Sequence, residues 1–407
     1  MAAVSAASRL ISALVINKIA ALYVGPSGFA ALGQFQNFTA IALNVGGHCY
    51  TNGIVQRLID SGKEAQAVPN IVIRTVVVTI LVTSIAIAIL VFVMRSLIAS
   101  WIFGGTLGPM ILVFAGCMVP LNLHYAFLAI TNGLKKPHLF AAINIAASAL
   151  TVTIGAFTIP LYGLLGALFT PLAANAFAAI VGYRVLRPYL KLSGAWSLAQ
   201  MDGSTSRLLI RYGMTALGAM LMGPTASIAI RTMLVARGMQ MEAGYWQAIT
   251  KLAEGYMLPL TMLMTMHYLP GFTRAQQDTI AFRRLIKVGA SQIFGGMLVV
   301  AGGLYVCRDT VISLLLSRDF YPIRNLFLPQ TMGDAFRGLT LLFQTAMLAR
   351  GLMRRYLATE VVFWGLFVVA LAIGLHFHRD AATVTYAYVV SAAVVAIGTS
   401  RFSYARR

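Results

Sequence analysis

Four charged side chains fall deep inside apolar stretches of the chain, at spacings that place them in pairs on helix faces. Lys251 and Glu254 are three residues apart, and Asp334 and Arg337 are likewise three apart farther along the chain. Residues with this spacing are neighbours on a helix surface. Because charge at such depth is costly, it marks either an ion pair that locks helices together or a polar path through the protein. Both interpretations stay open for these two pairs.

Two further basic residues at depth have no acidic neighbour close by in the sequence. Lys18 and Arg231 can donate charge-assisted hydrogen bonds to the oxygens of an anion. We expect both to face a substrate; the alternative is that their long side chains reach back to a membrane interface. The six charges at depth are thus four positive and two negative. Glu360 lies near the end of an apolar stretch, and we expect it at the interface.

Amide side chains in the same stretches add hydrogen-bonding capacity. Gln36 and Gln247 each close a short repeated motif, and either could bond sugar hydroxyls or a neighbouring helix. The candidate site therefore has two sets of residues. Lys18, Arg231, Lys251 and Arg337 are the expected substrate contacts, and Glu254, Asp334, Gln36 and Gln247 are the expected polar or coupling groups of a cavity.

The composition indicates which elements must position these residues. Hydrophobic residues make up 59% of the 407 residues and charged residues only 10%, too little polar surface for a soluble globule. We therefore predict an all-α polytopic membrane protein. The net charge of +20 is better explained by basic loops and an anionic substrate than by nucleic acid, because no soluble domain is present to bind it.

Twelve apolar windows are each long enough to cross a bilayer as a helix. They are residues 6–24, 29–53, 71–94, 107–131, 139–160, 163–186, 208–236, 244–269, 285–306, 323–349, 356–377 and 382–402. A short apolar run between residues 309 and 324 is bracketed by charges, and we expect an interfacial helix there.

The basic residues indicate how the spans are oriented. If the loops alternate between the two sides, 21 of the 31 Lys and Arg residues lie on the side of both termini and six on the other side. Basic residues near helix ends are enriched on the cytoplasmic side. This distribution predicts that both termini are cytoplasmic.

Internal repeats indicate that the twelve predicted spans form two halves. The motif GQFQ at residues 33–36 recurs as GYWQ at 244–247, and GLKK at 133–136 has a counterpart in GLMR at 351–354. We predict an N-terminal six-helix lobe over residues 1–190, a cytoplasmic linker over 191–207 and a C-terminal six-helix lobe over 208–407. Parallel repeats of this kind suggest alternating access by rocking of the lobes around a central cationic cavity.

No motif for catalysis or for a cofactor is present. The sequence has no P-loop, no HExxH and no GxSxG, and its three cysteines lack metal-ligand spacing. We predict that the protein is not an enzyme and that it uses neither a metal nor a cofactor.

Three stretches resemble Wzx-type flippases, the O-antigen translocases and lipid III flippases of the polysaccharide transporter branch of the multidrug/oligosaccharidyl-lipid/polysaccharide superfamily. They are GPSGFAALGQFQNF at 25–38, GYWQAITKLAEGY at 244–256 and LLLSRDFYPIRNLFLPQTMGDAFR at 314–337. The resemblance implies a MATE-like fold of two six-helix lobes. It also implies transport of an oligosaccharide on undecaprenyl pyrophosphate to the periplasmic leaflet, with a polysaccharide polymerase and a chain-length regulator as partners.

Two other functions are compatible with this architecture. A drug or cation antiporter of the same superfamily would be expected to bury unpaired acidic residues, whereas here the acids at depth are outnumbered. A lipid II flippase would also use basic cavity residues, but typically adds two C-terminal spans. The substrate implied by the resemblance fits the surplus of basic residues, since pyrophosphate cannot enter hydrocarbon without compensating charge.

Overall fold

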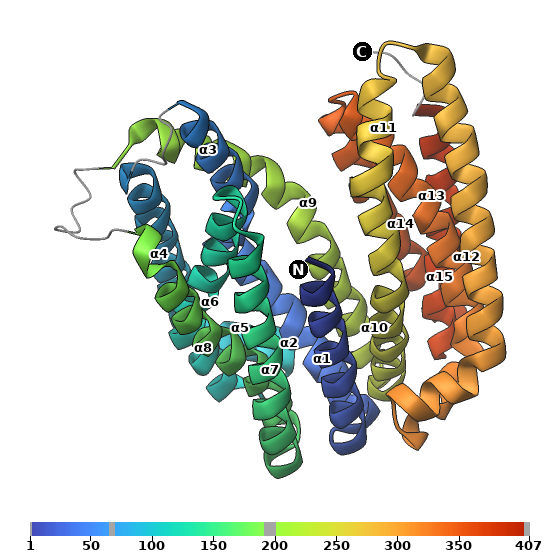
Figure 1. Ribbon diagram of the computed structural model, residues 1–407. Helices are drawn as coiled ribbons and strands as arrows, with labels where there is room; N and C mark the ends of the chain where they lie inside the picture. Colours follow the sequence, from blue (N-terminus) through green and yellow to red (C-terminus); the bar gives the residue numbers. More distant parts are fainter. Residues whose placement is uncertain (1, 65–69, 191–200, 403–407) are drawn as a thin grey trace. The chain divides into compact units, whose positions relative to one another are not determined.

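Nearly every described residue lies in a helix, as expected for a backbone that must satisfy its own hydrogen bonds within hydrocarbon (Figure 1). The computed structural model describes residues 2–64, 70–190 and 201–402. The predicted all-α fold is confirmed.

Twelve helices of the described chain are longer than 20 residues, and each coincides with a predicted span. They are α1 (Ala2–Tyr23), α2 (Gly25–Gly46), α4 (Asn70–Val93), α6 (Gly108–Gly133), α7 (Pro137–Tyr162), α8 (Leu164–Leu190), α9 (Gly203–Val235), α10 (Gln240–Leu263), α12 (Thr279–Leu315), α13 (Phe327–Ala349), α14 (Met353–Phe377) and α15 (Ala381–Phe402).

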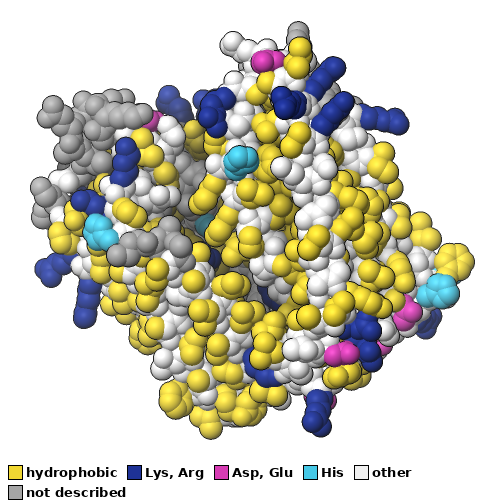
Figure 2. Space-filling view, turned by 45° about the vertical axis from the view of Figure 1, so that its right-hand side comes forward, with side chains coloured by type: hydrophobic (Ala, Val, Ile, Leu, Met, Phe, Trp, Pro, Cys, Tyr) yellow, Lys and Arg dark blue, Asp and Glu magenta, His cyan; other side chains and the backbone are white. Residues whose placement is uncertain are grey.

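Among the described residues, nine of these helices are long and apolar enough to cross a membrane. The exceptions are α2, α10 and α13, whose lengths suffice but whose polar residues lower their hydropathy. Hydrophobic side chains cover much of the visible helix flanks, and most visible Lys and Arg lie toward helix ends (Figure 2). The protein is a multi-pass membrane protein.

Shorter elements connect the long helices. They are η1 (His48–Tyr50), α3 (Thr51–Glu64), α5 (Arg95–Phe103), η3 (Met264–Tyr268), α11 (Leu269–Arg274) and η4 (Arg318–Leu326). The predicted interfacial helix between residues 309 and 324 is wrong, because α12 continues to Leu315 and only then gives way to η4. Charged residues such as Arg308 and Asp309 do not end a helix, and neither Gly nor Pro intervenes before Leu315.

The chain divides by packing into two units. Unit 1 comprises Met1–Val24 and Ala31–Thr225, and unit 2 comprises Gly25–Ala30 and Ala226–Arg407. The division therefore falls inside α9. Residues 191–200 of the predicted inter-lobe linker lie outside the described residues, and the lobe boundaries stay a prediction.

In unit 1, α7 packs against α8 and α1, and α6 packs against α8 and α4. Val76 and Ile80 of α4 meet Phe127 and Ile130 of α6 in its core.

Helix α2 ends where its glycines approach α6. A Cβ on Gly46 would lie 2.7 Å from Nδ2 of Asn122, so no larger residue fits without a shift. The Gly46 carbonyl, freed by the helix end, accepts a hydrogen bond from the Thr83 hydroxyl at 2.7 Å.

Unit 2 is organised around α13, which packs against α10, α12, α14 and α15. Two glycines allow this close approach, as small residues generally do between membrane helices. A Cβ on Gly333 would lie 2.4 Å from the Tyr388 ring of α15. A Cβ on Gly338 would lie 3.1 Å from Leu260 of α10 and 3.2 Å from Ile293 of α12.

A third close approach fixes the start of α10. A Cβ on Gly244 would lie 1.8 Å from the Pro26 carbonyl oxygen, so the two backbones are in direct contact. Gly255, eleven residues later on the same helix, has no atom of another element within 4 Å of its Cβ position. We expect Gly244→Ala to destabilise the protein by about 1–3 kcal/mol through overpacking. Gly255→Ala should be neutral or stabilise it by up to about 1 kcal/mol through helix propensity.

The measurement is the thermal midpoint of the purified protein in detergent, monitored by fluorescence-detected gel filtration. Equal midpoints for the two variants would contradict the close contact between Gly244 and Pro26.

Candidate functional site

Helices α2, α10 and α13, the three long helices of lower hydropathy, carry six of the eight predicted site residues. Gln36 lies on α2; Gln247, Lys251 and Glu254 lie on α10; Asp334 and Arg337 lie on α13; Lys18 and Arg231 lie on α1 and α9. A membrane-spanning helix with polar residues at depth must turn them toward protein or a wet space. The contacts of each side chain decide between a structural and a ligand-binding role.

The polar residues of α10 lie along one helix face, because Gln247, Lys251 and Glu254 are spaced by four and three residues. Lys251 Nζ lies 2.8 Å from Glu254 Oε2, so this predicted pair is confirmed. Their side chains are 24% and 59% exposed. The pair is therefore open enough to meet a ligand.

Arg231 is buried, with only 3% of its surface exposed. Its guanidinium donates a hydrogen bond to Oε1 of Gln247 and lies 4.9 Å from the centre of the Trp246 ring. Among the residues that the structure describes, no carboxylate forms an ion pair with it, and its Nε has no hydrogen-bond partner. A neutral amide, the Ser227 carbonyl and an aromatic face thus hold this cation, and none of the three carries a negative charge, so the guanidinium can still pair with an anion.

Asp334 on α13 accepts its hydrogen bonds from neutral groups. The hydroxyl of Tyr256 donates to Oδ2 at 2.5 Å, and the hydroxyl of Tyr388 donates to Oδ1 at 2.6 Å. The Gln330 amide, one turn earlier on α13, lies 3.2 Å from Oδ2. This carboxylate thereby joins α10, α13 and α15. Asp334 and Arg337 lie on the same helix, as predicted, but they do not form an ion pair with one another.

Arg337 pairs with Glu360 of α14 instead, at 2.7 Å. Glu360 is 7% exposed, so it is buried against neighbouring helices, and its expected place near the end of the span stays a prediction. The Gln344 amide also donates to Oε1 of Glu360 at 2.7 Å, and the guanidinium lies 4.3 Å from the centre of the Phe363 ring. Glu360 is buried because α14 begins at Met353, two turns before it, and packs against α13 and α15.

Glu360 adds one acidic residue to the predicted set of charges. Within unit 2 that set then comprises Arg231, Lys251 and Arg337 against Glu254, Asp334 and Glu360. With Lys18 of unit 1 the count is four basic residues against three acidic ones, a smaller surplus than expected. Arg231 and Lys251 remain distinctive because of their contacts rather than their number.

Lys18 and Gln36 belong to unit 1, and both side chains are half-buried. Oε1 of Gln36 has no hydrogen-bond partner within the described ranges. An acceptor of this kind can take a hydrogen bond from a hydroxyl group of a ligand. The ligand-binding roles of these two residues stay predictions.

The sequence interpretation missed Tyr256, Tyr388 and Gln330 around Asp334. Gln330 could have been found, because it lies four residues before Asp334 on the same helix face. Tyr388 lies 54 residues away in sequence, and no local pattern connects it to Asp334.

Comparison with known structures identifies the fold. The chain superposes on an inward-facing MATE multidrug transporter of the MOP superfamily with a TM-score of 0.82 and 13% identity, covering 97% of this chain and 93% of the other. The lipid II flippase MurJ gives a TM-score of 0.73 at 12% identity, over 99% of this chain and 86% of that chain. The fold is that of the MATE transporters, as predicted.

In sequence, the chain is similar to the lipid III flippases of Escherichia coli (strain K12) and Shigella flexneri. Each is 23% identical over 370 residues, which cover 88% of this chain and 86% of the relative. The resemblance to oligosaccharide-lipid flippases is therefore confirmed. The chain matches no protein-family model.

The Arg337–Glu360 pair allows a test of structural coupling. We expect Arg337→Met and Glu360→Gln each to cost about 3–5 kcal/mol, because each leaves a buried charge without its partner. The double variant Arg337→Met/Glu360→Gln should be more stable than the sum of the two losses predicts. Thermal midpoints of the purified variants measure this coupling.

Arg324→Met is the matched control, since Arg324 pairs with Asp309 at 3.4 Å with side chains 41% and 46% exposed. It should cost less than about 1 kcal/mol. Additive losses in the Arg337 and Glu360 variants would show that the two side chains are not coupled.

Proposed function

We propose that the protein is a flippase for an oligosaccharide linked to undecaprenyl pyrophosphate. It moves this lipid from the cytoplasmic to the periplasmic leaflet of the bacterial inner membrane by alternating access, with both termini in the cytoplasm. The carried glycan is an O-antigen repeat unit or the lipid III of enterobacterial common antigen. Relatives named lipid III flippases, similar over 88% of the chain, support this proposal.

The observation that carries the proposal is the state of Arg231. This buried cation is held by the Gln247 amide, the Ser227 carbonyl and an aromatic ring, and no carboxylate of the described chain forms an ion pair with it. A pyrophosphate would supply the missing negative charge through charge-assisted hydrogen bonds. Lys251, with its side chain partly exposed on the adjacent helix α10, would provide a second contact.

The other predicted residues take supporting roles in this proposal. Lys18 and Gln36 of unit 1 keep the substrate-binding roles predicted from the sequence, and Gln247 of unit 2 offers a hydrogen bond to a sugar. Arg337 and Glu254 are engaged with carboxylate and ammonium partners, so they act on the substrate through those pairs. A polysaccharide polymerase and a chain-length regulator would receive the translocated product.

A cation antiporter is the second candidate, and Asp334 is the observation that favours it. Within the described part of the chain, no basic side chain forms an ion pair with this buried carboxylate. A proton or metal cation could be exchanged there. The flippase accounts for Arg231 and for the sequence relatives, whereas the antiporter leaves Arg231 without a role.

Complementation of a bacterium that lacks its lipid III and O-antigen flippases tests the two candidates. We expect the wild type to restore surface glycan, and Arg231→Gln and Lys251→Gln to lower it about ten- to a hundredfold at equal membrane abundance. This is the loss expected for one charge-assisted hydrogen bond. Arg237→Gln, an exposed residue six positions after Arg231, should behave as wild type.

Wild-type activity in the Arg231 and Lys251 variants would show that these two charges have a structural role and no role in transport. Failure of the wild type to restore glycan, together with resistance to cationic dyes that Asp334→Asn abolishes, would favour the antiporter.

A further inference from the structure

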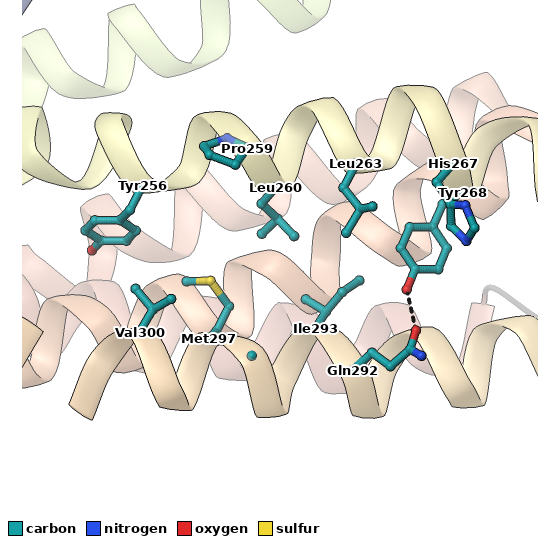
Figure 3. A pocket seen from close by; sticks show the side chains of 11 residues that line it. Tyr256, Pro259, Leu260, Leu263, His267, Tyr268, Gln292, Ile293, Met297 and Val300 are labelled. Atoms are coloured by element: carbon teal, nitrogen blue, oxygen red, sulfur yellow. Dashed lines mark hydrogen bonds between the residues drawn. The ribbon is translucent and has the colours of Figure 1, made fainter. Parts of the chain in front are cut away.

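A groove of about 420 Å³ runs between α10 and α12 within unit 2 (Figure 3). Tyr256, Leu260 and Leu263 line it from α10, and Ile293, Met297 and Val300 face them from α12. Both helices pack on α13, and a Cβ on Gly338 of that helix would touch Leu260, Ile293 and Met297. These contacts hold both walls of the groove against α13.

Two local features keep the groove open. Gly296 of α12 lines it without a side chain, and no atom of another element lies within 4 Å of its Cβ position. On the opposite wall, α10 passes into the π-helical turn η3, a departure from α-helical geometry that often accompanies functional sites. The groove is therefore built by the backbone as well as by side chains.

The polarity of the groove changes along its length. Its middle is apolar, and Leu263 is 43% exposed at its rim, so a hydrocarbon chain can enter sideways from the bilayer. One end is closed by a hydrogen bond of 3.0 Å from the Tyr268 hydroxyl to Oε1 of Gln292, beside His267 (Figure 3). At the other end Tyr256 donates its hydroxyl to Asp334.

Basic side chains lie beyond the Tyr268–Gln292 end. Arg274 of α11 follows His267 by seven residues. Arg284 of α12 precedes Gln292 by eight residues, which is just over two helical turns or roughly 12 Å. Both are exposed, as are Arg283 and Lys287 nearby. The acidic residue in this region, Asp278, caps α12 by accepting bonds from the Ile280 and Ala281 amides. The region is complementary to an anionic headgroup.

We propose that this groove holds the polyprenyl chain of the lipid-linked substrate, with its pyrophosphate among the basic residues at the start of α12. The assignment rests on the proposed flippase function. The substrate is favoured over bulk phospholipid because the groove follows α10, the helix that also carries Lys251. A headgroup moving toward Lys251 and Arg231 thus stays linked to a chain on the same helix.

Native mass spectrometry of the purified full-length protein tests the assignment, with undecaprenyl diphosphate and uncharged undecaprenol as probes. Gly296→Leu fills the groove without a clash, and we expect it to weaken binding of both probes about tenfold, equivalent to about 1.4 kcal/mol. Such a loss corresponds to roughly two displaced methylene contacts. Gly302→Leu is the matched control on α12, since its Cβ position is equally open but lies outside the groove lining.

A second variant separates binding of the diphosphate headgroup from binding of the polyprenyl chain. Arg284→Gln should weaken binding of the diphosphate about three- to tenfold and leave undecaprenol binding unchanged. Leu263→Ala, at the rim, should weaken both probes two- to fivefold and replaces Gly296→Leu if that variant has a lowered thermal midpoint.

Equal binding by wild type and both groove variants would overturn the assignment, as would displacement of the diphosphate by an equal concentration of phosphatidylglycerol. The complementation assay keeps this outcome distinct from failure of the proposed function. Restored glycan with unimpaired Gly296→Leu would reject the groove alone, whereas no glycan from the wild type would reject the flippase.

Discussion

A charge placed among membrane-spanning helices must be compensated inside the protein, and this constraint shapes unit 2. Arg337 and Glu360 neutralise one another across α13 and α14. Asp334 is stabilised by two tyrosine hydroxyls and an amide from three helices. Each arrangement depends on α13 lying close to its neighbours, which its glycines permit. Arg231 is the exception, since its partners are a neutral amide, a backbone carbonyl and an aromatic ring.

Helix α10 has one polar and one apolar side. The polar side carries Gln247, Lys251 and Glu254, whose groups suit a hydrophilic headgroup. The apolar side contributes Leu260 and Leu263 to a groove whose two walls, α10 and α12, both pack on α13. The proposed substrate combines charge, sugars and a hydrocarbon chain and would need both kinds of surface, which a single helix with two such sides keeps in register.

The spans could be predicted from sequence because the membrane imposes a local requirement on length and hydropathy. The Lys251–Glu254 pair was equally predictable, since its partners are three residues apart on one helix. Prediction failed where partners come from different helices. Arg337 and Glu360 are 23 residues apart, and the alternative partner Asp334 was nearer in sequence. The pairing of Glu360 with Arg337 was missed because hydropathy reports the place of a residue along a span but not the helix packed beside it.

The central position of α13 also has a consequence for biogenesis. Helices α10 and α12 leave the ribosome before α13, yet they pack on α13 rather than extensively on each other. Until residues 327–349 have been inserted, Tyr256 lacks its acceptor Asp334 and the apolar stripe of α12 lacks its main surface. Unit 2 therefore assembles late, and the earlier helices must wait in the bilayer, or beside an insertion factor, for the helix that joins them.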